Sequence, residues 1–343
     1  MNTTLHATSQ VLERHDNLFE QQHLVVAGQL ADAYPLQLLE QVASLQICCN
    51  HFGHYQYFSE QSHSKLSCQF SAQAQLQENS NALLFFMPKA KQEAAYLFAC
   101  ILPQLQQGAE IFVVGENRGG VKGCEKLLAS YGIKLNKIDS ARRCSLYFGT
   151  LNQTVPAFQL EPWFEHFEVA LPAKTLQVKS LPGVFNHGKL DEGSQLLLEQ
   201  LPAMHGAVLD FGCGAGIIGA SQALLYPIQI SLLDVSAYAI ASTQATLKEN
   251  AIAGTVIASD GLSEVKQRFD FIVSNPPFHA GIATQYETTE TFLAQAKQHL
   301  RENGELWIVA NSFLQYESLI KQHFSRYETK LDNKKFKILR CCV

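Results

Sequence analysis

The sequence lacks the features of a membrane-spanning or exported protein. No apolar run reaches the roughly 18 residues that a helix needs to cross a bilayer. The N-terminal residues MNTTLHATSQ carry neither the basic nor the apolar region of a signal peptide. The 9 cysteines are scattered and include no CxxC pair, which argues against a disulfide framework. We therefore expect a soluble, cytoplasmic protein with reduced thiols.

One group of potential metal ligands comes early in the chain. It comprises Cys48, Cys49, His51, His54 and His63. Adjacent cysteines on a strand point to opposite faces, and no second ligand pair follows at zinc spacing. We therefore expect no bound metal.

The sequence also has no excess of positive charge. Its formal net charge is −5 and only 17% of its residues are charged, so its overall field does not attract nucleic acid. A nucleic-acid partner would have to meet local basic groups. Candidates are Arg118, Lys122, Lys126, Arg142 and Arg143, and near the C-terminus Lys330, Lys334, Lys335, Lys337 and Arg340. Both groups have a plainer interpretation, as a solvated surface and as a charged edge strand respectively.

The pattern that is present is typical of an α/β protein. With 343 residues, 47% of them hydrophobic, the chain can form two domains, each with its own core. In the C-terminal half, short apolar runs alternate with segments of helical periodicity, which predicts a doubly wound, mostly parallel sheet. We expect strands over 206–212, 228–234, 255–260, 268–278 and 305–311, and helices over 217–226, 237–251, 288–300 and 316–324.

The N-terminal half repeats part of this pattern. An apolar strand, a proline turn, a long helix, a glycine turn, another strand and a helix follow one another from residue 83, as they do from residue 268. We therefore expect two domains of one architecture in tandem, over residues 1–160 and 186–343. Prolines and weak periodicity mark 161–185 as the linker.

The strongest local motif is the run DFGCGAGIIG, which starts at Asp210 between a predicted strand and a predicted helix. Glycines at such a turn let backbone N–H groups approach a ligand, and the helix N-terminus adds partial positive charge. Gly214, Gly216 and Gly219 match GxGxxG, and Asp234 lies twenty residues after Gly214, as an NAD site requires. From this motif alone, both NAD and S-adenosylmethionine remain possible as the bound cofactor.

Three further features favour S-adenosylmethionine. Asp210 places a carboxylate beside the glycines, which suits an ammonium group and opposes a pyrophosphate. Asp260 and Gly261 end the third strand, where a carboxylate can accept from an adenine amine. The sequence Asn-Pro-Pro-Phe then follows the fourth strand, beside the point where ligands bind in such sheets. The expected cofactor site comprises Asp210, Gly212, Cys213, Gly214, Gly216, Asp234, Val235, Ser236, Asp260, Gly261 and Asn275.

The tetrapeptide Asn275-Pro276-Pro277-Phe278 predicts a reaction at an exocyclic amine. The Asn275 side-chain oxygen and the Pro276 carbonyl can accept the two amine hydrogens and so direct the nitrogen lone pair outward. Phe278 offers a face on which an extruded base can stack. The neighbouring His279 is either a base or, as we favour, a residue that shapes the pocket.

These motifs resemble class I S-adenosylmethionine-dependent methyltransferases of the amino type, whose motif is (Asn/Asp)-Pro-Pro-(Tyr/Phe). The segments 184–198, 210–219 and 274–281 are similar to the "small" methyltransferase domain. The whole chain resembles the ribosomal small-subunit methyltransferase C group. The resemblance implies two tandem Rossmann-like methyltransferase domains, with 16S rRNA in the 30S subunit as partner. It also implies that Phe185, Gly188, Leu190, Asp191 and Ser194 help to close over the cofactor.

The N-terminal copy departs from the motif and is expected to be degenerate. Its first strand, within 24–35, is followed by neither a glycine loop nor an acid at the strand end, and Met87-Pro88-Lys89 replaces the tetrapeptide. We therefore assign it to packing and RNA docking.

We interpret the chain as a monomeric enzyme that methylates the N2 amine of a guanine in 16S rRNA. Other amino acceptors remain open at this point: the guanine of a different rRNA, an adenine N6, a DNA base or a glutamine amide. Two alternative functions from other classes also remain possible: an NAD-dependent dehydrogenase and a non-catalytic RNA-binding module.

Overall fold

The computed structural model describes residues 4–276, 282–312 and 316–343. The chain divides into two compact units, Met1–Trp163 and Phe164–Val343. Within the described ranges, the structure contains no helix with both the length and the apolar character that crossing a bilayer requires. In the same ranges no three His, Cys, Asp or Glu side chains gather in a way that would hold a metal.

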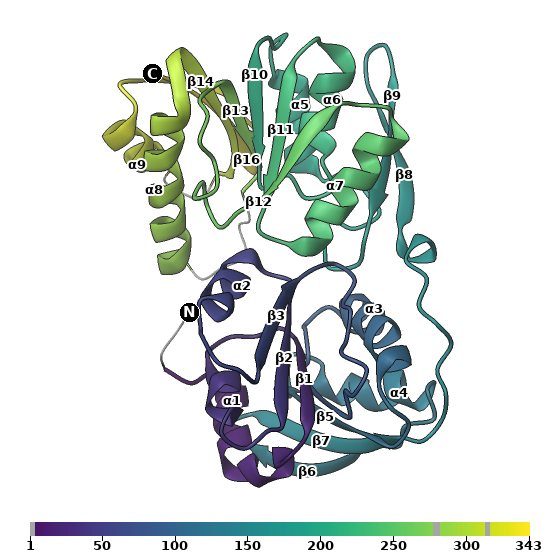
Figure 1. The fold of residues 1–343 in the computed structure, drawn as a ribbon. Coiled ribbons are helices and arrows are strands. Elements are labelled where there is room, and N and C mark those ends of the chain that lie inside the picture. The colour runs from purple at the N-terminus through teal and green to yellow at the C-terminus, as the bar shows by residue number, and fades with distance from the viewer. Residues whose placement is uncertain (1–3, 277–281, 313–315) are drawn as a thin grey trace. The chain divides into compact units, whose positions relative to one another are not determined.

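The first unit contains a seven-stranded sheet with the strand order β3-β2-β1-β4-β5-β7-β6 (Figure 1). Its strands are β1 (His23–Gly28), β2 (Ser44–Cys49), β3 (Leu66–Phe70), β4 (Ala82–Phe86), β5 (Ala109–Glu116), β6 (Asn136–Ala141) and β7 (Cys144–Leu151). Its α-helices are α1 (Ala7–Leu12), α2 (Phe52–Ser59), α3 (Lys91–Ile101) and α4 (Cys124–Ala129), with short 3-10 turns at Glu13–Phe19, Tyr34–Leu38, Leu102–Gln104, Val121–Gly123 and Glu161–Trp163. The strands from β3 to β5 pair in parallel, and β7 pairs antiparallel with both β5 and β6.

The second unit repeats this topology in its own seven-stranded sheet, with the order β12-β11-β10-β13-β14-β16-β15. Its strands are β10 (Ala207–Phe211), β11 (Gln229–Asp234), β12 (Gly254–Ala258), β13 (Phe269–Ser274), β14 (Leu300–Asn311), β15 (Arg326–Asp332) and β16 (Phe336–Cys342). Its helices are α5 (Glu192–Gln200), α6 (Ile217–Leu225), α7 (Ala237–Glu249), α8 (Ile282–His299) and α9 (Tyr316–His323). The two matching strand orders confirm the predicted tandem of doubly wound, mostly parallel sheets.

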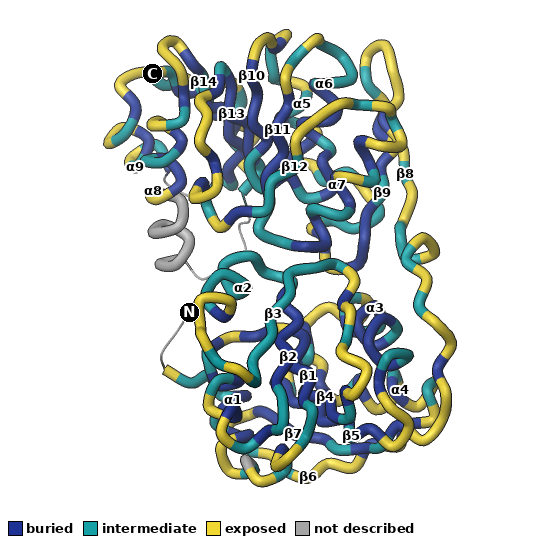
Figure 2. Tube along the Cα trace, viewed as in Figure 1, coloured by how far each residue is buried: buried dark blue, intermediate teal, exposed yellow. Residues whose placement is uncertain are grey.

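The central parallel strands of both sheets are buried, as Figure 2 shows by its dark blue segments. In the second unit, α8 and α9 cover one sheet face through a core that includes Leu209, Leu293 and Ile320. The helices α6 and α7 lie against β10 and β11 on the other face. Strands covered on both faces are continuously apolar because every side chain meets a protein neighbour.

Residues 161–185, the predicted linker, contain a hairpin of the second unit. It pairs β8 (Glu165–Ala170) antiparallel with β9 (Thr175–Ser180), and β9 packs on α7. Along β9, Leu176 and Val178 are buried while Thr175 and Gln177 are exposed. This alternation of apolar and polar residues is characteristic of a half-buried strand, but it extends over only a few residues between the prolines.

The structure also differs from the sequence prediction around Asn303 and Gly304. We expected a helix up to residue 300 and a strand only from residue 305, but β14 already begins at Leu300. The pairing with β13 shifts register between the pairs Phe269↔Leu300 and Phe271↔Glu305. Asn303 adopts a φ of 62°, so the turn-forming pair lies in an irregularity within the strand.

Candidate active site

The glycine loop joins β10 to α6 at the carboxyl end of the sheet. The N–H groups of Gly212 and Cys213 both donate to the Leu233 carbonyl of β11, at 2.8 and 2.9 Å. Gly216 is the N-cap of α6 and has a φ of 78°, a conformation that glycine adopts without the steric cost of a Cβ. A Cβ at Gly219 would lie 3.0 Å from the Asp210 Cβ, so this glycine permits close packing of helix and strand.

Asp234 ties the end of β11 to this loop. One carboxylate oxygen accepts from the Gly214 N–H at 2.9 Å, and the other accepts from the Ser236 N–H at 2.9 Å. Burial raises the pKa of Asp234, and these hydrogen bonds from the backbone oppose that rise. Thr243 on α7 supports the same loop, since its hydroxyl donates to the Gly214 carbonyl at 3.0 Å. Sequence reasoning missed Thr243 because only the fold brings α7 against the loop.

Asp210 lies beneath the glycine loop and is almost fully buried. Its Oδ2 accepts from the Gly219 N–H at 2.8 Å, whereas its Oδ1 has no hydrogen-bond partner in the part of the chain that the structure describes. Burial raises the pKa of Asp210 to about 7, and the nearby Asp234 carboxylate adds to the rise. A buried carboxylate oxygen without a partner suits a cationic ligand group.

The third strand end lies at the same edge of the sheet. Ser259 follows β12 and donates its N–H to the Asp234 carbonyl at 3.1 Å, which holds the two strand ends together. The next residue, Asp260, is exposed, and Gly261 turns the chain with a φ of 61°. The predicted order of acids along the strand ends, Asp210, Asp234 and Asp260, therefore follows three neighbouring strands.

Asn275 and Pro276 directly follow β13, which pairs with β10. Ser274 lies opposite Phe211 in the register, and its hydroxyl donates to the Phe211 carbonyl at 2.9 Å. The Asn275 side-chain nitrogen donates to Asp191 Oδ1 at 3.0 Å and to Ser194 Oγ at 2.9 Å. The predicted residues Pro277, Phe278 and His279 lie outside the described residues.

The residues implied by resemblance precede α5 or lie in its first turn. Asp191 caps this helix by accepting from the Ser194 N–H at 3.0 Å, and both residues contact Asn275. Leu190 is half-buried, whereas Phe185 is 50% exposed. A Cβ at Gly188 would lie 2.8 Å from Glu165 Cγ of β8.

The first unit differs at the corresponding strand ends. Gly28, at the end of β1, adopts a φ of 98°, and the following Gln29 N–H donates to the Phe86 carbonyl at 2.8 Å. The chain after β1 thus stays hydrogen-bonded to the end of β4, whereas the loop after β10 is hydrogen-bonded to β11. A cavity of about 290 Å³ remains beside these strand ends, with His6, Lys89 and Glu116 among its lining residues.

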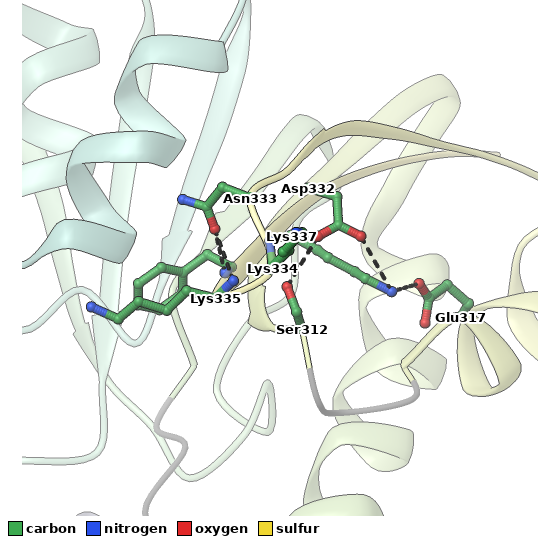
Figure 3. A network of polar contacts seen from close by, with 8 residues as sticks. Ser312, Glu317, Asp332, Asn333, Lys334, Lys335 and Lys337 are labelled. Atoms are coloured by element: carbon green, nitrogen blue, oxygen red, sulfur yellow. Dashed lines mark hydrogen bonds and ion pairs between the residues drawn. The ribbon is translucent and has the colours of Figure 1, made fainter.

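The basic residues near the C-terminus lie on the β15–β16 hairpin, with β15 at the sheet edge. Four of them form ion pairs with acidic residues of the same unit: Lys330 with Glu328, Lys335 with Glu192, Lys337 with Glu317 and Arg340 with Glu305. Figure 3 shows Lys337 between Glu317 and Asp332. In contrast, Arg118, Lys122, Lys126, Arg142 and Arg143 of the first unit are all exposed.

Comparison with known proteins identifies both halves of the chain. Residues 175–340 match the family model "Methyltransferase small domain", and residues 9–167 match "Methyltransferase small domain N-terminal". The fold is similar to that of the Thermus thermophilus 16S rRNA N2 G1207 methyltransferase in complex with AdoMet and guanosine. That likeness has a TM-score of 0.84 at 21% identity, and it covers 98% of this chain and 92% of the other.

Curated relatives extend along nearly the whole length. Ribosomal RNA small subunit methyltransferase C from Aliivibrio salmonicida (strain LFI1238) is 46% identical over 333 residues, which is 97% of each chain. The protein of the same name from Vibrio parahaemolyticus is 47% identical over 335 residues, again 97% of each chain. The chain therefore belongs to the ribosomal RNA small subunit methyltransferase C family.

Proposed function

We propose that this protein transfers a methyl group from S-adenosylmethionine to the exocyclic N2 amine of a guanine in 16S rRNA. One observation carries the proposal. Both hydrogens of the Asn275 amide nitrogen are engaged by Asp191 and Ser194, at the end of the strand next to the glycine loop. The amide oxygen is thereby left to accept a hydrogen bond from a substrate.

The residues at the strand ends fit the cofactor. The Asp210 Oδ1, which has no partner among the described residues, suits the ammonium group of the methionine moiety, and the exposed Asp260 carboxylate can accept from the adenine amine. Asp234, already oriented by the Gly214 and Ser236 N–H groups, retains lone pairs for the ribose hydroxyls. When bound, the cofactor supplies an electrophilic methyl group on a sulfonium centre.

The chain's own residues would act mainly by positioning. A guanine amine is a poor nucleophile because its lone pair is delocalised into the ring. The Asn275 Oδ1 and the Pro276 carbonyl can hold its two hydrogens, so that the lone pair points out of the hydrogen-bonded plane. Neither acceptor is a strong base, and alignment with the methyl group supplies most of the rate enhancement.

Two findings support rRNA guanine over the other acceptors. The curated relatives carry the name of a small-subunit rRNA methyltransferase, and the similar solved structure is described as an N2 enzyme in complex with guanosine. Membership in a methyltransferase family also sets aside the NAD-dependent dehydrogenase. Because every described residue of the proposed site belongs to one unit of one chain, we infer that a monomer is sufficient for activity.

The test uses purified protein, S-adenosylmethionine and 30S particles from a strain that lacks this gene. Nucleosides from the treated 16S rRNA are separated and identified by mass spectrometry. We expect one new N2-methylguanosine per particle and no change in particles treated without cofactor. A methyl group on adenine N6, or RNA binding without any transfer, would contradict the proposed function.

A further inference from the structure

We propose that Asp191 and Ser194 are positioning residues for the Asn275 amide, and that the carboxylate at position 191 makes asparagine, not aspartate, the residue required at 275. This inference rests on the proposed function and deepens it. It concerns a choice that the family motif, with Asn or Asp at its first position, leaves open.

The partners of the Asn275 side chain fix the orientation of its amide. The Asn275 Nδ2 lies 3.0 Å from Asp191 Oδ1 and 2.9 Å from Ser194 Oγ, so each of its two hydrogens has an acceptor. An ionised carboxylate can only accept hydrogen bonds. An inverted amide would therefore set its own oxygen against the Asp191 carboxylate, and this repulsion fixes the nitrogen on the α5 side. The oxygen consequently faces away from α5.

The two acceptors, Asp191 and Ser194, are themselves held rigidly. Asp191 is the N-cap of α5, and the same Oδ1 that holds Asn275 also accepts from the Ser194 N–H at 3.0 Å. Ser194 is only 6% exposed, so its hydroxyl has little freedom to move. The contacts join residues 84 and 81 positions apart in the sequence. The first turn of α5 therefore acts as a fixed frame for the end of β13.

The first turn of α5 is itself held in place by a neighbouring turn of the chain. A Cβ at Gly193 would lie 3.1 Å from Asp191 Oδ1 and 3.5 Å from both Asn275 Nδ2 and Phe336 Cε1. The β15–β16 turn, from Asp332 to Phe336, thus packs against the start of the helix. Figure 3 shows how Asn333 organises this turn, with its side-chain oxygen directed at the backbone of Lys335.

The negative charge of the Asp191 carboxylate distinguishes asparagine from aspartate at position 275. Asn275→Asp would place a second carboxylate about 3 Å from that of Asp191, in a half-buried site where two like charges repel strongly. Asp191→Asn alone keeps an acceptor oxygen and removes the charge. Combined with Asn275→Asp, it leaves a single charge at this site, and the Ser194 hydroxyl can turn to donate to the new carboxylate.

A double-mutant cycle tests the proposal on the full-length protein. Methyl transfer to 30S particles and melting temperature are measured for the wild type, Asn275→Asp, Asp191→Asn and the double variant. We expect kcat to fall roughly 10²-fold in Asn275→Asp and less than about tenfold in Asp191→Asn. The double variant should recover at least about tenfold in kcat over Asn275→Asp and should melt at a higher temperature than that single variant.

The matched control is Glu199→Gln, the same change of acid to amide at the other end of α5. Glu199 is exposed and pairs with Gln195 on its own helix, so both measurements should match the wild type. Asn275→Asp with wild-type activity would overturn the proposal, as would a double variant no better than Asn275→Asp. The melting temperatures need no substrate. A wild type that methylates another acceptor would refute the proposed function and leave the predicted coupling between 191 and 275 to be judged on stability alone.

Discussion

At the scale of single residues, Asn275 combines two tasks in one amide. Its nitrogen is bound by Asp191 and Ser194, and we propose that its oxygen accepts a hydrogen bond from the substrate. We expect Asn275→Ala to lower kcat by roughly 10² or more while cofactor affinity changes only a few-fold, because the lost hydrogen bond orients the reacting nitrogen. Single-turnover methyl transfer and calorimetric titration with S-adenosylhomocysteine measure the two effects. Near-normal turnover would contradict the acceptor role.

Asp210 predicts how cofactor affinity depends on pH. Burial raises the pKa of its carboxyl to about 7, so the free protein holds this group largely protonated in mildly acidic solution. A ligand ammonium favours the ionised form, which means that affinity should increase as the pH rises through that pKa. We expect roughly tenfold tighter binding of S-adenosylhomocysteine at about pH 8 than at about pH 6.

The matched variant is Asp210→Asn, which preserves the shape of the side chain and cannot ionise. The affinity of this variant for S-adenosylhomocysteine should be lower than that of the wild type at about pH 8, and it should be nearly constant between about pH 6 and about pH 8. If the variant retains the full pH dependence, another group is responsible for it.

At the scale of elements, the strand-to-helix turn depends on Gly216. In Gly216→Ala, the new Cβ would lie 3.1 Å from Thr243 Oγ1 on a backbone with a φ of 78°. We expect a loss of about 1–2 kcal/mol in the free energy of unfolding of the second unit, together with weaker cofactor binding. The control is Gly108→Ala in the first unit. Gly108 has a φ of 88°, and a Cβ built on it would meet open space. This change should lower the stability of the first unit and leave cofactor affinity unchanged. Equal cofactor affinity in both variants would contradict the role of the loop.

Elements with strong local signals could be predicted from the sequence. The predicted helix 217–226 is α6, Ile217–Leu225, because apolar periodicity and the preceding glycines mark both its face and its start. The β8–β9 hairpin is held against the distant helix α7, and the irregularity near Asn303 depends on the pairing of β14 with β13; no local pattern encodes either contact. The same limit applied at the site. The strand-end acids followed from chain order, whereas the contact of Asn275 with Asp191 needed the fold.

At the scale of the whole molecule, the distribution of charge bears on how RNA is recognised. The formal net charge is −5, and most basic residues on the β15–β16 hairpin are neutralised by acidic partners. The exposed basic residues of the first unit, such as Arg142 and Arg143 in the β6–β7 turn, are offset by acidic residues of the same unit, such as the exposed Glu125. Phosphate contacts alone therefore provide a weak hold on naked RNA.

This charge balance predicts a preference for assembled substrate. Extruding a guanine from a stack costs a few kcal/mol, which contacts elsewhere on the substrate must offset. A folded 30S particle presents a fixed surface, and recognition by shape can supply those contacts without a strongly basic protein. We expect methyl transfer to be at least about tenfold more efficient on 30S particles than on protein-free 16S rRNA. A tritium-transfer assay on both substrates at matched salt makes the comparison, because phosphate contacts weaken as ionic strength rises. Equal rates, or faster transfer to the free RNA, would show that charge and local sequence suffice, and recognition by shape would then have to be abandoned.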